Sequence, residues 1–166
     1  MFSVNDTVRY GTAGVCRIDR TQTRVVGGEE ETYYVLRPVH DARSTVYVPV
    51  NNPTLAGRMM PVLSRSQVMA IIQSLPGLPD CWIPDDQERK RRYRESFVSA
   101  DRQTMAAVIK TLYERLLALR EHGKRLRVDD ERCLREAERL LYDEFSLALD
   151  MAPEEVPAFI RDQLGQ

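Results

Sequence analysis

The spacing of apolar residues changes near residue 50 of this chain of 166 residues. Before that point apolar and polar residues alternate within short segments, and after Asn51-Asn52-Pro53 apolar residues recur every three or four positions. Alternation places successive side chains on opposite faces of a strand, whereas the longer period lines one face of a helix. The change of period predicts an α+β fold in two parts, a β domain at residues 1–60 and a helical domain at residues 61–166.

The first part consists of short runs rich in β-branched and aromatic residues, which favour strands. Turn-forming residues separate the runs, and Gly27-Gly28 is the clearest of these signals. The expected strands are residues 7–10, 14–18, 32–36 and 44–50. Such short strands, so close together, predict a small and strongly bent antiparallel sheet or barrel.

The second part carries amphipathic stripes that begin at capping residues. The expected N-caps are Ser64, Asp85, Asp101 and Asp129. Pro153 indicates the start of a last short helix. Between the first two helices the proline-rich stretch LPGLPDCWIP indicates an elbow at about residues 76–85. Because the stripes need one another to bury their apolar faces, we expect a compact helical domain.

Composition indicates a soluble globular protein, with 43% hydrophobic and 30% charged residues. No stretch has the roughly 18 consecutive apolar residues of a membrane span. The start MFSVNDTVRYG lacks the basic beginning and apolar middle of a secretory signal. We therefore expect a cytoplasmic protein without a membrane partner, and a monomer.

The sequence offers little support for catalysis or metal binding. Cys16, Cys81 and Cys133 are far apart and lack a CxxC pattern or clustered histidines, so we expect buried thiols and no metal site. The two histidines, His40 and His122, belong to no nucleophile–base arrangement, and no glycine-rich phosphate cradle is present. We expect a non-enzymatic protein without a cofactor.

Charge is balanced overall but locally uneven. A net charge of −1 argues against a protein that coats nucleic acid through bulk charge. Two basic blocks remain, residues 89–94 (RKRRYR) and residues 120–127 (REHGKRLR), and any contact with nucleic acid must use them. The only tryptophan, Trp82, lies just before the first block. It is either a nucleic-acid contact or a packing anchor in the elbow.

Both halves of the chain contain ordered motifs. In the first half these are Phe2-x-Val4-x-Asp6-x-Val8-x-Tyr10, Gly14, Tyr33-Tyr34-Val35-Leu36 and Val46-Tyr47-Val48-Pro49-Val50-Asn51-Asn52. In the second half they are Arg92-Tyr93-Arg94-Glu95, Ser99-Ala100-Asp101, Val108-Ile109-x-x-Leu112-Tyr113 and the run from Asp130 to Phe145. In their order and spacing, over nearly the whole chain, these motifs resemble the CarD/CdnL family of bacterial transcription regulators, whose N-terminal domain is shared with the transcription-repair coupling factor.

The resemblance implies a Tudor-like, SH3-like β domain that binds the β subunit of RNA polymerase. It also implies a helical domain that contacts promoter DNA at the upstream edge of the transcription bubble and stabilises the open complex. The alternative is a protein–protein adaptor that docks on polymerase or another partner without functional DNA contact.

The resemblance assigns residues to the polymerase interface. Arg24 occupies the place of a family arginine that contacts acidic polymerase residues, and a guanidinium can pair a carboxylate through two parallel hydrogen bonds. The alternative interpretation is that Arg24 is a solvated arginine on a hairpin without a binding role. Tyr47 stands where the family has a second arginine, and nearby Arg43 is a candidate to supply the missing charge.

The resemblance also assigns candidates for DNA contact. The family's DNA-facing tryptophan aligns with about Arg89, whereas Trp82 lies seven residues earlier, so Trp82 is either a wedge at an opened base step or an anchor between domains. Arg89, Lys90 and Arg92 are candidates to contact a phosphate backbone. The alternative is that they belong to a solvated helix face on which glutamates lie between the cations. Lys124 and Arg125 form a second candidate patch with the same alternatives.

Overall fold

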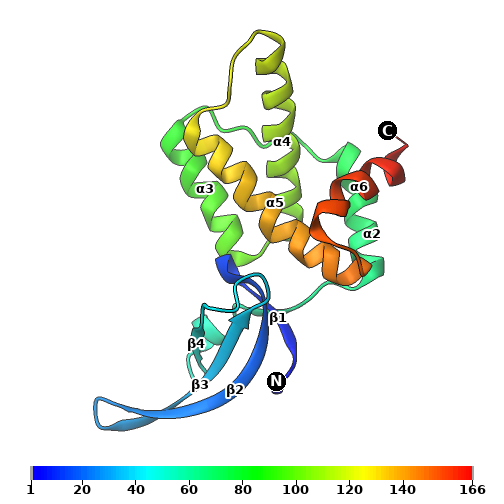
Figure 1. Cartoon of the computed structure of the whole chain (residues 1–166). Coiled ribbons are helices and arrows are strands. Elements are labelled where there is room, and N and C mark those ends of the chain that lie inside the picture. The colour runs from blue at the N-terminus through cyan, green and yellow to red at the C-terminus, as the bar shows by residue number, and fades with distance from the viewer. Residues whose placement is uncertain (1, 166) are drawn as a thin grey trace. The chain divides into compact units, whose positions relative to one another are not determined.

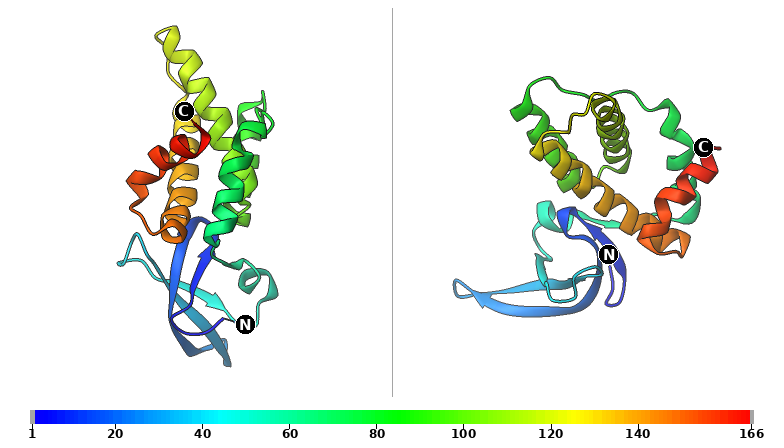
Figure 2. Two further views of the ribbon diagram at one scale, coloured as in Figure 1. Left: turned by 90° about the vertical axis from the view of Figure 1, so that its right-hand side faces the viewer. Right: turned by 45° about the horizontal axis from the view of Figure 1, so that its top comes forward.

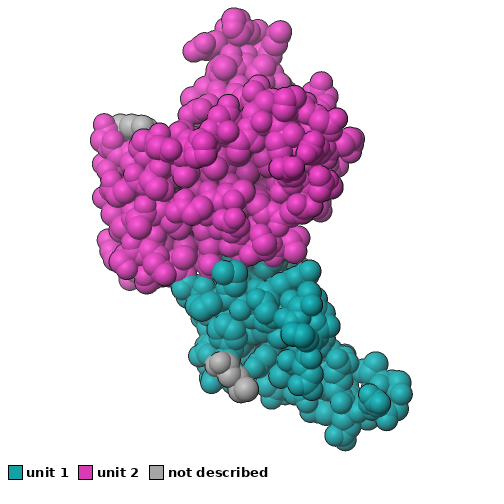
Figure 3. Space-filling model, turned by 180° about the vertical axis from the view of Figure 1, so that it is seen from behind, with its two compact units in different colours: residues 1–62 teal, residues 63–166 magenta. Residues whose placement is uncertain are grey.

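The computed structural model describes residues 2–165 and divides the chain into two compact units, residues 1–62 and residues 63–166 (Figure 3). Unit 1 holds the strands and unit 2 the long helices (Figure 1). An antiparallel sheet followed by a helical region confirms the predicted α+β class. No helix within the described residues has the length and apolar character needed to cross a membrane.

Unit 1 is a five-stranded antiparallel sheet in the order β4-β3-β2-β1-β5. Its elements are β1 (Thr7–Tyr10), a 3-10 turn (Gly11–Ala13), β2 (Gly14–Val26), β3 (Glu29–Pro38), β4 (Val46–Pro49), α1 (Pro53–Ala56) and β5 (Met59–Pro61). β5 was not expected from the sequence. It pairs with β1, so β1 has neighbours on both sides.

The hairpin of β2 and β3 is longer than the sequence analysis predicted. Residues 16–26 pair with residues 29–38, and Gly27 and Gly28 form the turn with φ of 61° and 86°. Positive φ at two consecutive positions is the requirement of a tight hairpin turn, and glycine meets it without strain. The sequence did not predict this extension, because the outer half of β2 faces no core and so lacks the alternation of apolar and polar residues that marks a half-buried strand.

One face of the sheet is packed and the other carries polar side chains. The packed face includes Val8, Ile18, Leu36 and Val48, all fully buried. Full burial of each such side chain contributes about 1.5–3 kcal/mol, so this small core can hold the sheet together. Alternate residues of β2 and β3 point to the opposite face, where Val35 is buried and Arg24 and Tyr47 are exposed; its exposed part is the surface considered below.

Unit 2 is a bundle in which α4 and α5 are the longest helices (Figures 1 and 2). Its elements are α2 (Arg65–Ser74), a 3-10 turn (Leu75–Gly77), α3 (Asp86–Ser99), α4 (Arg102–Glu121), α5 (Val128–Leu149), a 3-10 turn (Pro153–Glu155) and α6 (Val156–Leu164). Their apolar stripes form two adjoining cores, one shared by α3, α4 and α5, the other centred on α2, α5 and α6.

Capping explains where most of these helices begin. Ser64 forms a capping box with Gln67, and the carboxylates of Asp85 and Asp101 accept from the backbone N–H groups of Glu88 and Thr104. The prediction that Asp129 caps α5 is wrong, because the N-cap is Arg127 and the helix begins at Val128. Asp129 lies instead in the first turn, where its charge is favourable at the positive end of the helix dipole.

Candidate functional site

The exposed face of the sheet brings together two residues that the sequence analysis assigned to one interface. The guanidinium carbon of Arg24, on β2, lies 4.2 Å from the centre of the Tyr47 ring, on β4. Tyr33, on the strand between them, meets Tyr47 edge-on at 6.3 Å between ring centres. A cation over a tyrosine face is attracted by the ring quadrupole, so Arg24 is held in place although it is exposed.

The sheet register explains this cluster. Arg24 pairs with Glu31 and Val35 pairs with Tyr47, which places alternate residues of β2, β3 and β4 on the same face. The Tyr33 hydroxyl donates to Glu31 Oε2 at 2.7 Å, and this hydrogen bond raises the pKa of Tyr33. Among residues 2–165 Arg24 forms no hydrogen bond or ion pair, so its N–H donors are available to a partner's carboxylate.

Arg43 does not join this cluster. It is exposed in the connection between β3 and β4, where its backbone N–H donates to the side chain of Asp41 at 3.2 Å. Within residues 2–165 no ring contact or ion pair links Arg43 to Arg24 or Tyr47. The structure therefore supplies no contact by which Arg43 replaces the charge that Tyr47 lacks.

A second polar group lies farther along the same sheet face. A β-bulge between Ile18 and Arg20 accommodates Asp19, whose carboxylate pairs with Arg20 at 2.7 Å and with Arg37 at 3.3 Å. The hydrogen bond from Arg20 is the main cause of the lowered pKa of Asp19. Sequence reasoning missed this ion-pair group, because the bulge that creates it leaves no recognisable pattern.

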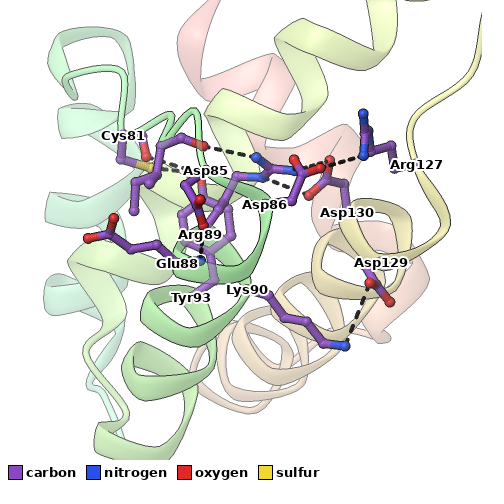
Figure 4. A network of polar contacts seen from close by, with 11 residues as sticks. Cys81, Asp85, Asp86, Glu88, Arg89, Lys90, Tyr93, Arg127, Asp129 and Asp130 are labelled. Carbon is purple, nitrogen blue, oxygen red and sulfur yellow. Dashed lines mark hydrogen bonds and ion pairs between the residues drawn. The ribbon is translucent and has the colours of Figure 1, made fainter.

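In unit 2, Arg89 is part of a buried network and is not a surface cation (Figure 4). Its side chain is 2% exposed, and Nε and one terminal nitrogen donate to the two carboxylate oxygens of Asp130 at 2.8 and 2.9 Å. The remaining donors reach Asp86 at 2.7 Å and the carbonyl of Ile83 at 2.9 Å. The expectation that Arg89 reaches a phosphate does not fit this geometry, because the guanidinium is enclosed and its donors are engaged.

The network continues from Arg89 to the surface. Asp86 accepts from Arg89 and also pairs with Arg127, which lies just before α5 (Figure 4). The hydrogen bond from Arg89 is the main cause of the lowered pKa of Asp86. Asp86 thus joins the first turn of α3 to the connection between α4 and α5.

Trp82 packs within unit 2. It is partly buried against the core shared by α3, α4 and α5. The guanidinium carbons of Arg89 and Arg115 lie 4.0 and 3.5 Å from its ring centre. Two cations over one indole are the contacts expected of a fixed side chain, which weighs against the alternative of a free wedge.

The elbow that carries Trp82 is hydrogen-bonded to the neighbouring helices. The Cys81 backbone N–H donates to Thr111 Oγ1 at 3.1 Å, and the Tyr93 hydroxyl donates to the Cys81 carbonyl at 3.0 Å. The Lys110 amine donates to the Leu78 carbonyl at 2.8 Å. These bonds satisfy backbone groups that would otherwise lie unpaired beside the helices, and they fix the elbow on α3 and α4.

The other cations of α3 are exposed, or in the case of Lys90 partly exposed, and several face carboxylates. Arg91 pairs with Glu95 at 2.9 Å and Arg92 with Glu88 at 3.2 Å, both one helical turn apart. Lys90 pairs with Asp129 of α5 at 3.6 Å. Exposed pairs of this kind are worth about 0–1 kcal/mol, so the cations can exchange their carboxylates for other anions.

Lys124 and Arg125 lie in the exposed connection between α4 and α5. Gly123 turns the chain with φ of 66°, and buried Leu126 fastens the connection to the core. Among the described residues neither Lys124 nor Arg125 forms an ion pair. This connection therefore presents cations that are held near the bundle and still open to an anion.

The thiols differ from the expectation of three buried groups. Cys16 is buried, whereas Cys81 and Cys133 are partly exposed. Burial raises the pKa of Cys16 to about 11. Among residues 2–165 no three histidine, cysteine or acidic side chains are grouped so that they could hold a metal ion.

Comparison with protein families identifies both halves of the chain. Residues 2–62 match the CarD-like/TRCF RID domain, and residues 84–161 match the CarD C-terminal domain. The chain belongs to the CarD family. The family consists of non-enzymatic transcription regulators, and the two matched domains identify this CarD-family protein as a transcription regulator that interacts with RNA polymerase. Trp82 lies outside both matched segments, whereas Arg89 lies inside the second.

Proposed function

We propose that the exposed sheet face of unit 1 binds the β subunit of RNA polymerase and that unit 2 contacts promoter DNA at the upstream edge of the bubble, stabilising the open complex. The observation that carries the proposal is the stacking of Arg24 over Tyr47. It gathers two positions that are distant in sequence onto one exposed face. The residues proposed for this interface are Arg24, Tyr47 and Tyr33, with Arg43 at its margin.

Stacking makes the exposed arginine a better binding residue. A free arginine loses rotamer freedom when a partner immobilises it, and a guanidinium already held over a ring loses less. Aromatic residues and arginine are also the types enriched at the centres of protein interfaces. With Tyr47 in place of a family arginine, the interface has one positive charge fewer, but the tyrosine ring orients the guanidinium of Arg24.

In unit 2 the proposed DNA contacts are Lys124 and Arg125, supplemented by Lys90 and Arg92. These side chains would fix the unit on the phosphate backbone without reading base sequence. Binding to polymerase raises the effective concentration of the helical unit at the promoter, so weak DNA contacts suffice. Opening is favoured only to the extent that the unit binds the opened junction better than closed duplex.

The test follows open-complex lifetime on a fluorescently reported promoter with the cognate polymerase. Arg24→Glu should abolish the lengthening caused by the wild type, and Lys124→Gln with Arg125→Gln should reduce it while polymerase binding persists. The matched controls are Arg58→Glu, an exposed arginine of unit 1, and Arg65→Gln at the start of α2. A wild-type protein that binds polymerase and leaves the lifetime unchanged would refute the mechanism.

A second candidate is an adaptor that docks on polymerase without functional DNA contact. It is favoured by the pairing of Arg91, Arg92 and Lys90 with carboxylates, which is how a solvated helix face is arranged. Binding of the free protein to a forked promoter fragment separates the two. Salt-sensitive binding that weakens in the Lys124→Gln/Arg125→Gln variant supports DNA contact, and its absence at low salt supports the adaptor.

A further inference from the structure

Unit 2 contains an open apolar cavity that the proposed function does not use. Its volume is about 630 Å³, and it lies among α4, α5, α6 and the 3-10 turn after α2. Pockets for small molecules in proteins commonly measure about 300–1,000 Å³ and are mostly apolar with a few polar groups. The size and lining of this cavity fall within that description.

The apolar wall on α4 is unusually exposed. Ile109, Tyr113 and Leu117 recur every four residues and line the cavity together. Tyr113 is 47% and Leu117 44% exposed, although both are large apolar side chains. Single exposed apolar residues need no explanation, but these two border one common hollow, which Phe145 of α5 and Ile160 of α6 also line.

Hydrogen-bond donors are available in this apolar setting. Tyr113, Tyr142 and Arg161 all line the cavity, and among residues 2–165 neither tyrosine hydroxyl makes a hydrogen bond to the protein. Burial raises the pKa of Tyr142 to about 12, with smaller contributions from Glu138 and Tyr113, while Arg161 lowers it. The hydroxyl of Tyr142 therefore keeps its proton and can donate at neutral pH.

Of the cations that line the cavity, one has no ion-pair or hydrogen-bond partner among the described residues and is available to a ligand. Three cations and two carboxylates line it. Lys110 already donates to the carbonyls of Pro76 and Leu78, and Arg135 pairs with Glu138 at 3.4 Å. Arg161 is exposed and forms no ion pair among the described residues, and Glu114 is the exposed carboxylate that remains.

We propose that this cavity binds a small amphipathic monocarboxylate, with its carboxylate on Arg161 and the tyrosine hydroxyls and its apolar body along α4 and α5. A guanidinium with two phenols is a set of donors, and a carboxylate is an acceptor at both oxygens. One negative charge also balances the single excess positive charge of the lining. The site is separate from the sheet face and from the basic connection assigned to polymerase and DNA.

The test measures binding of octanoate to the full-length protein by calorimetry and by chemical-shift changes. The matched probes are 1-octanol, which keeps the chain without the charge, and octylammonium, which reverses the charge. Octanoate should bind most tightly, and its shifts should fall on Tyr113, Leu117, Tyr142 and Ile160. Arg161→Gln should weaken octanoate binding roughly tenfold, as the loss of a charge-assisted hydrogen bond implies, and leave octanol unaffected.

Tyr142→Phe should weaken octanoate severalfold without altering the fold, since its hydroxyl makes no internal hydrogen bond. Arg132→Gln, which removes an exposed arginine of α5 outside the cavity, is the matched control and should change nothing. Tighter binding of octylammonium would overturn the proposal, because it would make Glu138 or Glu114 the selecting group. Octanoate binding that is absent, or unaffected by Arg161→Gln, would overturn it as well.

Discussion

Replacing Asp130 with asparagine should destabilise unit 2 by about 3–5 kcal/mol, because the change leaves the charge of Arg89 buried without its main partner. The wild-type carboxylate accepts two hydrogen bonds from Arg89, at 2.8 and 2.9 Å, and both side chains are almost inaccessible to solvent. Asparagine has the same shape, so the loss would come from charge and hydrogen bonding and not from a cavity. Asp86 would remain near the guanidinium and would compensate only in part, since its side chain is 43% exposed to solvent.

Urea denaturation measures this effect through Trp82 fluorescence and helical circular dichroism. Trp82 is the only tryptophan and packs in unit 2, so its emission reports on that unit. With a urea slope of about 2 kcal/mol/M, a loss of 4 kcal/mol moves the midpoint down by about 2 M. If the substitution alters the emission of Trp82 directly, the circular dichroism signal still reports the unfolding midpoint independently.

The double variant Arg89→Met/Asp130→Leu is the decisive control. Replacing both members of a buried pair with apolar residues is often neutral or stabilising, so this variant should unfold close to the wild type. A loss below about 1 kcal/mol in Asp130→Asn would refute the assignment of Arg89 as a structural residue. The same conclusion would follow if Arg89→Met kept full stability and lost only DNA binding, since that is the behaviour of a phosphate contact.

Three further predictions concern other parts of the chain. Glu88→Gln and Glu95→Gln free the cations of α3, so each should tighten binding to a forked DNA fragment about twofold to fivefold at low salt, measured by fluorescence anisotropy. Looser binding would mean that these cations do not approach the phosphates. The pKa of Tyr142 is raised to about 12, so its stabilisation is complete below about pH 10 and is lost as the pH rises toward 12. Tyr142→Phe should therefore flatten the alkaline decline of the urea midpoint, and an unchanged slope would contradict the burial of this hydroxyl. Native protein treated with iodoacetamide near neutral pH should keep Cys16 unlabelled, as peptide mass analysis can show, because the thiol is buried and its pKa is about 11. Rapid labelling of Cys16 without unfolding would count against the packing of the sheet.

The overall fold could be predicted because it depends on local signals. The change of apolar period near residue 50 separates the sheet from the bundle, and Ser64, Asp85 and Asp101 mark helix starts by contacts only three residues long. The errors arise where a partner is distant or a local signal is ambiguous. The prediction of Asp129 as a cap is wrong because the sequence VDDE contains several acids near one helix start, and only the folded geometry decides among them.

The surroundings of the candidate site residues were harder to predict for the same reason. Nothing in RKRRYR distinguishes Arg89 from its neighbours, because its burial depends on Asp130, 41 residues later in the chain. The periodicity of Tyr93 and Phe97 identifies the buried side of α3, and Arg89 lies one turn before Tyr93 on that side. That spacing was the one available signal that this cation faces inward. Arg115 carried no comparable signal, because its contact with Trp82 requires the elbow to fold back on α4.

The pairing of surface charges constrains the DNA contact that we propose for unit 2. Where a cation already has a carboxylate partner, binding a phosphate exchanges one ion pair for another and yields little net energy. Lys124 and Arg125 avoid this exchange, but two unpaired cations alone give weak and salt-sensitive binding. A regulator with such a surface would act on DNA chiefly while it is attached to polymerase, where the effective local concentration is high. Titration of the free protein and of its polymerase complex against the same forked fragment tests this dependence, and equal affinities would show that the sheet face makes no contribution to DNA binding.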